Sequence, residues 1–221
     1  MEGSGKILPS LQEALLKCGV RDGMVLSFHH HFRDGDYVVN LVMETVAALG
    51  IKDITICASS LGAAHDPVAK LIEEGVVTGI QSSGVRGKIG EAISGGRLKN
   101  PAVIRSHGGR VRAIEEGDVH IYLAFIGAAT SDEYGNARGV GGKSNCGVLS
   151  YSMVDAKYAD HVVVVTDCLV EYPNLPASIS QVDVDYVVEV EAIGNPDKIV
   201  SNVVRMTNDV RELKMAEYCA R

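Results

Sequence analysis

The sequence predicts an α/β protein with an open, mainly parallel sheet and helices on both of its faces. Short runs of β-branched residues alternate with amphipathic segments through most of the 221 residues, which is the order of elements in parallel sheets. Several runs are apolar at consecutive positions, as expected for strands that are covered on both sides. No internal repeat or linker interrupts the chain. At roughly 150 residues per domain we expect one domain over residues 1–221.

Six runs are expected to form strands: Met24–Phe28, Ile54–Cys57, Val76–Ile80, Ile121–Ile126, Val162–Thr166 and Tyr186–Val190. Helices are expected at Leu11–Lys17, Asp36–Leu49, Pro67–Glu74, Lys88–Ser94 and Val210–Tyr218. The first helix is the best marked, because Ser10 and Glu13 form a capping box before it and Gly19 follows it. The last, capped by Asn208 or Asp209, is either an ordinary terminal helix or one that has been cut.

Composition excludes several classes of function. Twenty-one basic and 28 acidic residues give a net charge of −7, which argues against a nucleic-acid or anionic-membrane surface. No apolar stretch approaches the roughly 20 residues of a membrane span, and residues 1–6 lack the core of a signal peptide. We therefore expect a cytoplasmic protein. The five cysteines (Cys18, Cys57, Cys146, Cys168 and Cys219) are widely spaced and are expected to be buried thiols, neither disulfides nor zinc ligands.

Ligands of open α/β sheets bind outside the carboxyl ends of the strands. Five polar loops of this chain are candidates for such a site, and four of them follow predicted strands. The first contains His29, His30 and His31, which cannot all enter a core. Three interpretations stay open for it: a polar loop without function, a metal site whose other ligands are not recognisable, and a loop that donates hydrogen bonds to an anionic substrate. The last is favoured.

Two further loops can hold anions. Ser59–Gly62 offers hydroxyls and free N–H groups, and His65 and Asp66 beyond it are expected to be capping residues. In Gln81–Gly90 the glycines are three apart, which does not match the dinucleotide-binding pattern. That loop is interpreted as an anion cradle carrying Arg86 and Lys88.

The last two loops are Ser106–Arg110, with adjacent glycines and an arginine, and Ser131–Asn136, which continues through Gly139–Asn145. The Asp-Glu-x-Gly-Asn part of the fifth loop is typical of a turn. No nucleophile elbow, serine-triad order or Walker-type phosphate loop is found in the chain. Ordinary serine hydrolases and P-loop enzymes are therefore excluded.

At these loops the chain resembles the citrate lyase alpha subunits, which are citrate CoA-transferases within the wider group of family I CoA-transferases. The matching segments are Asp22–His30, Ser82–Glu91, Ser106–Val111, Asp132–Asn136, Gly142–Gly147, Glu171–Ile179 and Thr207–Leu213. They cover nearly the whole chain in the family's order. The resemblance implies a domain equivalent to the N-terminal half of that subunit.

The resemblance also implies a reaction and partners. Citrate exchanges with the acetyl group of a thioester, which releases acetate and forms a citryl thioester. The thioester belongs to CoA or to a phosphoribosyl-dephospho-CoA group on the gamma (acyl-carrier) subunit, and the beta subunit then cleaves the product. No tightly bound cofactor and no metal are expected in this chain.

Loops and resemblance together give the candidate site. Substrate is expected at His29, His30, Ser82, Ser83, Gly84, Arg86, Lys88, His107, Gly108, Gly109 and Arg110, and the CoA side at Asp132, Glu133, Gly135, Asn136, Lys143 and Asn145. Arg86, Lys88 and Arg110 are expected to meet in one pocket for a tricarboxylate. Alanine at Arg86 or Arg110 is expected to weaken citrate binding with little loss of stability.

The sequence departs from the family pattern in two respects. His30-His31-Phe32 stands where the wider family often has Gly-Gly-Phe, an oxyanion-type loop, so its backbone donors are expected to serve. The family's glutamate nucleophile lies in a second half that this chain lacks, so its catalytic residue is unknown. We expect half an active site, completed by a second-half chain or a homodimer partner. Alternatives are a noncatalytic carboxylate- or CoA-binding or assembly module, and a metal-dependent enzyme built on His29–His31.

Overall fold

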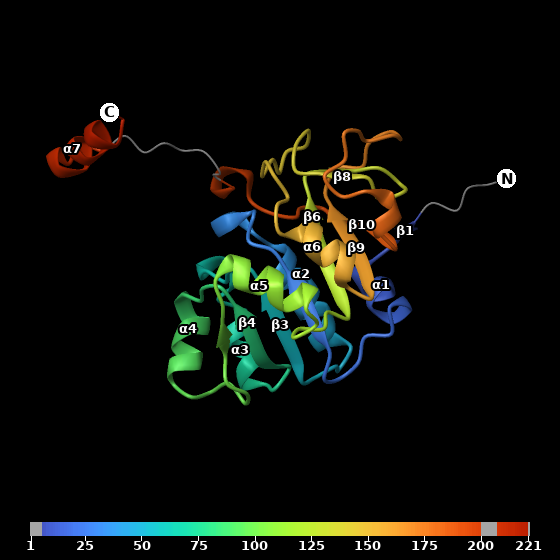
Figure 1. Ribbon diagram of the computed structural model, residues 1–221. Coiled ribbons are helices and arrows are strands. Elements are labelled where there is room, and N and C mark those ends of the chain that lie inside the picture. The colour runs from blue at the N-terminus through green and yellow to red at the C-terminus, as the bar shows by residue number, and fades with distance from the viewer. Residues whose placement is uncertain (1–5, 200–206, 221) are drawn as a thin grey trace.

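The computed structural model describes residues 6–199 and 207–220. Eight parallel strands form one sheet in the order β1-β10-β9-β6-β2-β3-β4-β5 (Figure 1). Their bounds are β1 Ile7–Leu8, β2 Val25–Phe28, β3 Ile54–Ala58, β4 Val77–Ser82, β5 Val103–Ile104, β6 Leu123–Ala128, β9 His161–Thr166 and β10 Tyr186–Glu189. A small antiparallel pair, β7 (Thr130–Ser131) and β8 (Ala137–Arg138), stands apart from the sheet. The predicted fold class is confirmed.

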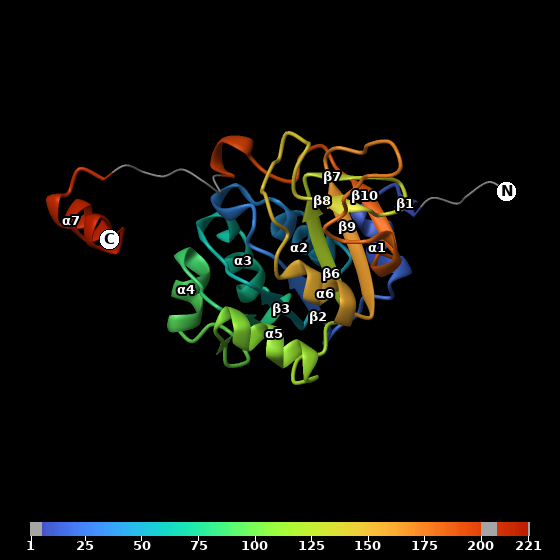
Figure 2. The same cartoon turned by 45° about the horizontal axis from the view of Figure 1, so that its top comes forward.

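Helices cover both faces of the sheet (Figures 1 and 2). On one face lie α1 (Leu11–Lys17), α2 (Val38–Ala48) and α3 (Val68–Glu73), with α4 (Gly87–Ser94) beside α3. The opposite face is covered by α5 (His107–Glu115) and α6 (Ser152–Tyr158). A further helix, α7 (Val210–Cys219), is exposed along its whole length. In the described part of the chain, no helix combines the length and apolar character that a bilayer crossing requires.

Local signals in the sequence account for most of these boundaries. Ser10 Oγ accepts a hydrogen bond from Glu13 N at 3.1 Å, so α1 begins where the capping box predicts. The helix α2 starts at Val38, later than predicted, with Tyr37 at the N-cap, and Asp36 Oδ1 accepts a hydrogen bond from Val38 N at 2.7 Å. Asp209 caps the predicted α7.

Other expectations need correction. Ser106–Arg110 is not a loop, because Ser106 caps α5 and the next residues form its first turn. The edge strands β1 and β5 have only two residues each, and neither they nor α6 were predicted. Among the cysteines, Cys18, Cys57 and Cys146 are buried as expected, whereas Cys168 is half-buried and Cys219 is exposed.

The strand order creates a switch point in the middle of the sheet. After β2 the chain builds β3, β4 and β5 on one side, and after β6 it builds β9 and β10 on the other. The connections that leave β2 and β6 therefore diverge, and a crevice opens between them at the carboxyl ends. This is the place where open α/β sheets bind ligands.

A glycine in β6 lets the first polar loop close onto the sheet beside this crevice. Phe32 is 1% exposed, and a Cβ at Gly127 would collide with its ring. The Gly127 carbonyl also accepts a hydrogen bond from the His31 ring at 2.8 Å. The loop after β2 is thus fixed against β6.

We predict that Gly127→Ala lowers the free energy of unfolding by about 1–3 kcal/mol, because Phe32 must move to admit the methyl group. Urea unfolding followed by circular dichroism measures the change. Gly108→Ala is the matched control, since nothing lies within 4 Å of its added Cβ, and it should leave stability equal or higher. Equal stability of Gly127→Ala and the wild type would contradict the close packing.

Candidate functional site

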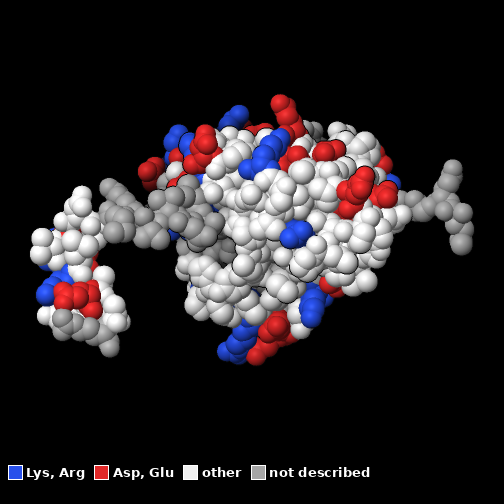
Figure 3. Space-filling model, turned by 90° about the horizontal axis from the view of Figure 1, so that it is seen from above, with Lys and Arg blue, Asp and Glu red and all other residues white. Residues whose placement is uncertain are grey.

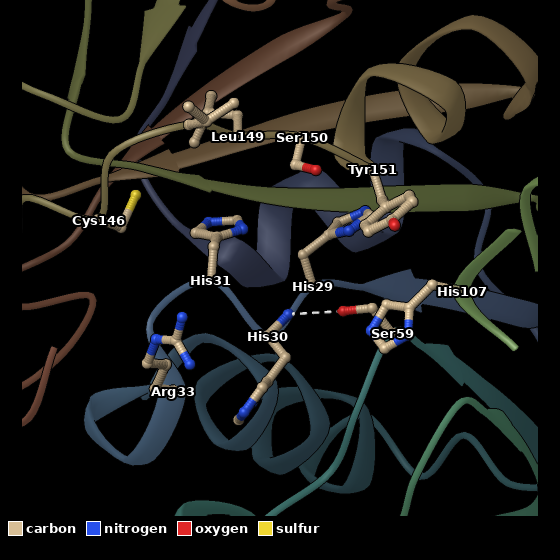
Figure 4. Close-up of a pocket in the computed structure, with 11 residues that line it drawn as sticks. His29, His30, His31, Arg33, Ser59, His107, Cys146, Leu149, Ser150 and Tyr151 are labelled. Atoms are coloured by element: carbon tan, nitrogen blue, oxygen red, sulfur yellow. Dashed lines mark hydrogen bonds between the residues drawn. The ribbon is translucent and has the colours of Figure 1, made fainter. Parts of the chain in front are cut away.

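A cleft of about 260 Å³ opens at the carboxyl ends of β2 and β3, beside the switch point (Figure 4). This volume lies just below the ~300–1,000 Å³ of typical drug-sized sites, so it suits a small metabolite. Four segments line it: the loop after β2, the end of β3, the start of α5 and residues 146–151 before α6. The lining residues are His29, His30, His31, Arg33, Ser59, His107, Cys146, Val148, Leu149, Ser150 and Tyr151.

Behind the cleft lies a buried ionic network that joins one layer of helices, α5 and α6, to the sheet. Arg110 on α5 donates two hydrogen bonds to Asp155 on α6, Nη1 to Oδ1 at 2.9 Å and Nη2 to Oδ2 at 2.6 Å. His29 Nε2 lies 2.9 Å from the same Asp155 Oδ2. Ser27 on β2 hydrogen-bonds Asp155 and accepts from Arg110 Nη2 at 2.8 Å. His29 is thus anchored from behind while it faces the cleft.

The electrostatics of this network keep both partners charged. Burial alone would raise the pKa of the Asp155 carboxyl, but His29 and the Arg110 guanidinium outweigh it and hold that pKa well below its usual range. Burial would likewise lower the pKa of Arg110, and the adjacent carboxylate raises it instead. The Arg110 guanidinium is 3% exposed and bonded on one side to Asp155, so it does not meet Arg86 and Lys88 in a substrate pocket.

The other two histidines of the loop are held by the protein as well. Burial, with the neighbouring His29, lowers the pKa of His31 to about 4, so its ring is neutral and donates to the Gly127 carbonyl. Burial and the nearby His65 lower the pKa of His30, whose backbone N–H donates to Ser59 Oγ at 2.9 Å. That N–H is therefore not free for the oxyanion role that the sequence suggested. Among the described residues no group of three or more His, Cys, Asp or Glu is placed to hold a metal ion.

His65 and Asp36 form a second buried pair that fixes the loop. His65 Nε2 lies 3.0 Å from Asp36 Oδ2, and its Nδ1 accepts from Gly62 N at 3.1 Å. Both residues are buried. His65 does cap the chain locally, as expected, and it also ties the loop after β3 to the loop after β2.

Arg33 is the positively charged side chain of the cleft, and the sequence analysis missed it. Among the residues that the structure describes, no other Lys or Arg lines the cleft, and no residue forms a hydrogen bond or ion pair with the Arg33 guanidinium. Its backbone is left-handed, with φ of +51°, a conformation that costs a non-glycine residue ~1–3 kcal/mol and is concentrated at functional sites. Ser150, across the cleft, is also left-handed at φ +45°. The signal available was its position in the first polar loop, two residues after His31.

The anion cradle predicted at Arg86 and Lys88 is occupied by the protein itself. Asp66 Oδ1 accepts a hydrogen bond from Lys88 N at 2.8 Å, so a carboxylate already sits at the start of α4. Arg86 is exposed at the N-cap of α4, and Lys88 borders a separate hollow with Lys70 and Arg97. Neither lines the cleft. The expected convergence of three basic residues is therefore wrong.

The remaining predicted residues support neighbouring turns. Ser82 Oγ donates to Gly84 O at 3.0 Å, and Ser83 Oγ is buried without a partner among the described residues. His107 does line the cleft, with its ring 5.3 Å from that of Tyr151, whereas Gly108 and Gly109 belong to the first turn of α5. Ser82, Ser83, Gly84, Gly108 and Gly109 are not among the lining residues.

The predicted CoA-side residues hold a structural network outside the cleft. Burial would raise the pKa of Asp132, but hydrogen bonds from Asn174 and Asn136 lower it. Its carboxylate is fully buried and accepts from the backbone of Asn174 at 2.9 Å and of Asn136 at 3.0 Å. Further along, Lys143 donates to Glu191 O at 2.7 Å and Asn145 Oδ1 accepts from Gly141 N at 2.8 Å. Glu133 and Gly135 complete the turn, and none of this set lines the cleft.

Figure 3 looks down on the end of the molecule toward which the strands run. Side chains in the middle of this face are mostly neither acidic nor basic, and charged ones gather toward its rim. The acidic residues behind the net charge of −7 are therefore not concentrated in the middle of this face. A single cation such as Arg33 has a strong influence in such a setting.

Comparison with known proteins identifies the family. The family model for the citrate lyase alpha subunit (CitF) matches residues 4–221. The citrate lyase alpha chain of Haemophilus influenzae is 50% identical over 215 residues, which cover 97% of this chain and 43% of that protein. A crystal structure of the alpha subunit of citrate lyase from Streptococcus mutans, in complex with citrate, superposes with a TM-score of 0.94 at 55% identity, covering 100% of this chain and 43% of that one.

More distant structures share the fold alone. An acyl-CoA transferase from Escherichia coli O157:H7 gives a TM-score of 0.66 at 16% identity, over 93% of this chain and 52% of that one. Glutaconate CoA-transferase from Acidaminococcus fermentans gives a TM-score of 0.62 at 15% identity, over 83% of this chain and 75% of that one. The chain therefore has the fold of these CoA-transferases. Within that class, the chain belongs to the citrate lyase alpha subunit family, and it spans less than half the length of the curated relatives it matches.

We predict that Asp155→Asn lowers the free energy of unfolding by ~3–5 kcal/mol at neutral pH, because Arg110 loses its buried counter-charge. The pKa of Asp155 is depressed by folding, so its contribution is present above its unfolded value of about 3.9 and is lost as the pH falls further. The gap between wild type and variant should therefore shrink below about pH 4.

Urea unfolding at pH 7 and pH 3 measures this gap. Asp160→Asn is the matched control, because its pair with His120 is exposed and should contribute ~0–1 kcal/mol at either pH. A gap that stays constant with pH would show that the Asp155 charge does not stabilise the fold. By the same reasoning, Arg110→Ala should destabilise the protein, contrary to the expectation from sequence.

Proposed function

We propose that this chain is the substrate-binding half of a citrate CoA-transferase, the component of citrate lyase that loads citrate onto a thioester. Membership of the citrate lyase alpha subunit family supports the reaction class. The observation that carries the proposal is the cleft at the switch point, where Arg33 has no ion-pair partner among the described residues and several hydrogen-bond donors lie beside it. The citrate bound in the Streptococcus mutans relative supports the choice of substrate.

The proposed exchange converts acetyl thioester and citrate into citryl thioester and acetate. The C–S bond of the acetyl thioester breaks, and a C–S bond to the same sulfur forms at a carboxyl carbon of citrate. Citrate loses one carboxylate oxygen and the acetyl group gains one, and this oxygen is exchanged through the expected glutamate. The thioester is that of CoA or of the phosphoribosyl-dephospho-CoA group on the gamma subunit, and the beta subunit uses the product. These partners, and a cytoplasmic location suited to five free thiols, are carried over from the family resemblance.

The residues of the cleft divide the binding of a tricarboxylate between them. The unpaired Arg33 guanidinium offers a planar fork to one carboxylate. Ser59 Oγ already accepts from His30 N–H, so its own proton is left for a ligand oxygen. Of the substrate and CoA-side residues predicted from the sequence, His29, His30 and His107 line the proposed site. The other predicted residues lie outside the cleft. The glutamate nucleophile is expected from a second-half chain or a partner copy, so this chain contributes half of an active site.

We predict that Arg33→Gly weakens citrate binding by about 10- to 100-fold, since a hydrogen bond to a charged group contributes ~1.5–3 kcal/mol. Glycine suits the left-handed backbone at this position, so stability should be unchanged or higher. Isothermal titration calorimetry gives the affinity and thermal unfolding gives the stability.

Arg86→Ala is the matched control, because Arg86 is exposed outside the cleft, and it should bind citrate as the wild type does. Normal citrate binding by Arg33→Gly together with weak citrate binding by Arg86→Ala would contradict this prediction. It would show that the citrate carboxylates bind at the loop after β4.

We predict that the chain alone forms no citryl-CoA from acetyl-CoA and citrate, and that adding the C-terminal half of a full-length relative restores it. The reason is that the attacking glutamate is expected outside this chain. Mass spectrometry of the CoA esters measures the product. Full turnover by the chain alone would contradict the half-site. Citrate binding without product in the combined sample would favour a noncatalytic binding module.

A further inference from the structure

The ring of His29 has one nitrogen anchored and one nitrogen open. Its Nε2 lies 2.9 Å from Asp155 Oδ2, inside the buried network. No described residue hydrogen-bonds its Nδ1. The buried polar atoms without a partner include Nδ1 of His30 and of His31 but not Nδ1 of His29, so this nitrogen remains accessible at the cleft that His29 lines.

The network decides which nitrogen carries the proton. Asp155 is ionised and accepts hydrogen bonds only, so the His29 nitrogen that faces it must be N–H. In the neutral ring the proton is then on Nε2, and Nδ1 is a bare acceptor. Arg110 occupies both oxygens of Asp155, and Ser27 occupies one as well, so the carboxylate cannot turn away. The tautomer of His29 is fixed from behind.

We propose that His29 Nδ1 selects a hydroxy acid, by accepting a hydrogen bond from the alcohol group of the bound polycarboxylate. A carboxylate has no proton to donate to a bare acceptor, so a neutral His29 gains nothing from carboxylates and gains from a hydroxyl. Arg33 and the Ser59 hydroxyl, on the same cleft, supply the donors that carboxylates need. This inference rests on the proposed function, since it assumes that citrate enters this cleft, and it adds the group by which citrate is distinguished.

The test compares citrate with tricarballylate, which has the same three carboxylates and lacks the hydroxyl. Calorimetry at pH 8, above the range in which imidazoles are protonated, measures both ligands on the full chain. We expect the wild type to prefer citrate by at least about 10-fold, because a site built to bind a hydroxyl rejects the analogue without it. His29→Gln keeps an amide N–H donor for Asp155, and it has no acceptor atom at the position of the ring Nδ1, because its amide oxygen is bonded one carbon further along the side chain. It should bind citrate about as weakly as tricarballylate, with tricarballylate itself little changed.

His120→Gln is the matched control, because His120 forms the same kind of pair with Asp160 at 2.8 Å, on the surface and away from the cleft. It should keep the wild-type preference. If His29→Gln fails to fold, imidazole ¹⁵N shifts of the wild type with citrate decide the matter. The proton should then lie on Nε2 of His29, and a proton on Nδ1 would overturn the inference.

The outcomes separate this inference from the proposed function. Absence of citrate binding by the wild type would overturn the function and the inference with it. Equal affinity of the wild type for citrate and tricarballylate would leave the function standing and overturn the role of His29. If His29→Gln still prefers citrate over tricarballylate, the inference is likewise overturned, because another group must then bind the citrate hydroxyl.

Discussion

The buried ion pair between Arg110 and Asp155 is the interaction on which the rest of the site depends. It lies on α5 and α6, and it reaches β2 and β3 through Ser27 and the Cys57 carbonyl, so one pair of charges joins one helix layer to the middle of the sheet. Such a pair contributes little net stability compared with apolar packing, but leaving either partner alone is costly. Its role is therefore one of position: it holds the His29 ring at the cleft in one orientation.

The cleft itself follows from strand order and backbone strain. The switch between β2 and β6 separates two connections, and Gly127 lets the loop after β2 close onto β6 through Phe32. The loop then places Arg33 in a left-handed conformation that glycine would adopt more readily. Retaining an arginine there, in a cleft that no other Lys or Arg of the described residues lines, is consistent with a site for an anion.

The sequence predicted the fold and the family well, because both depend on features spread along the chain. Consecutive apolar runs such as Val162–Thr166 and local caps such as Ser10 are readable from neighbours alone. It also predicted a polar loop after the first central strand, and residues of that loop line the cleft. The basic residues were assigned wrongly, since their partners are distant in sequence: Asp155 neutralises Arg110 from 45 residues away, and Asp66 fills the start of α4 near Lys88 from 22 away. Periodicity and motif spacing carry no information on such pairs. Arg33 was missed for a different reason, because the loop was interpreted from the three histidines before it alone.

The central claim is that a tricarboxylate binds between the loop after β2 and the segment before α6. Backbone ¹H–¹⁵N NMR spectra recorded during a citrate titration test it most directly, because each amide reports its own surroundings. The account predicts the largest saturable shifts at residues 29–33, 59 and 146–151. Shifts centred instead on residues 82–88, or no saturable shift anywhere, would contradict it.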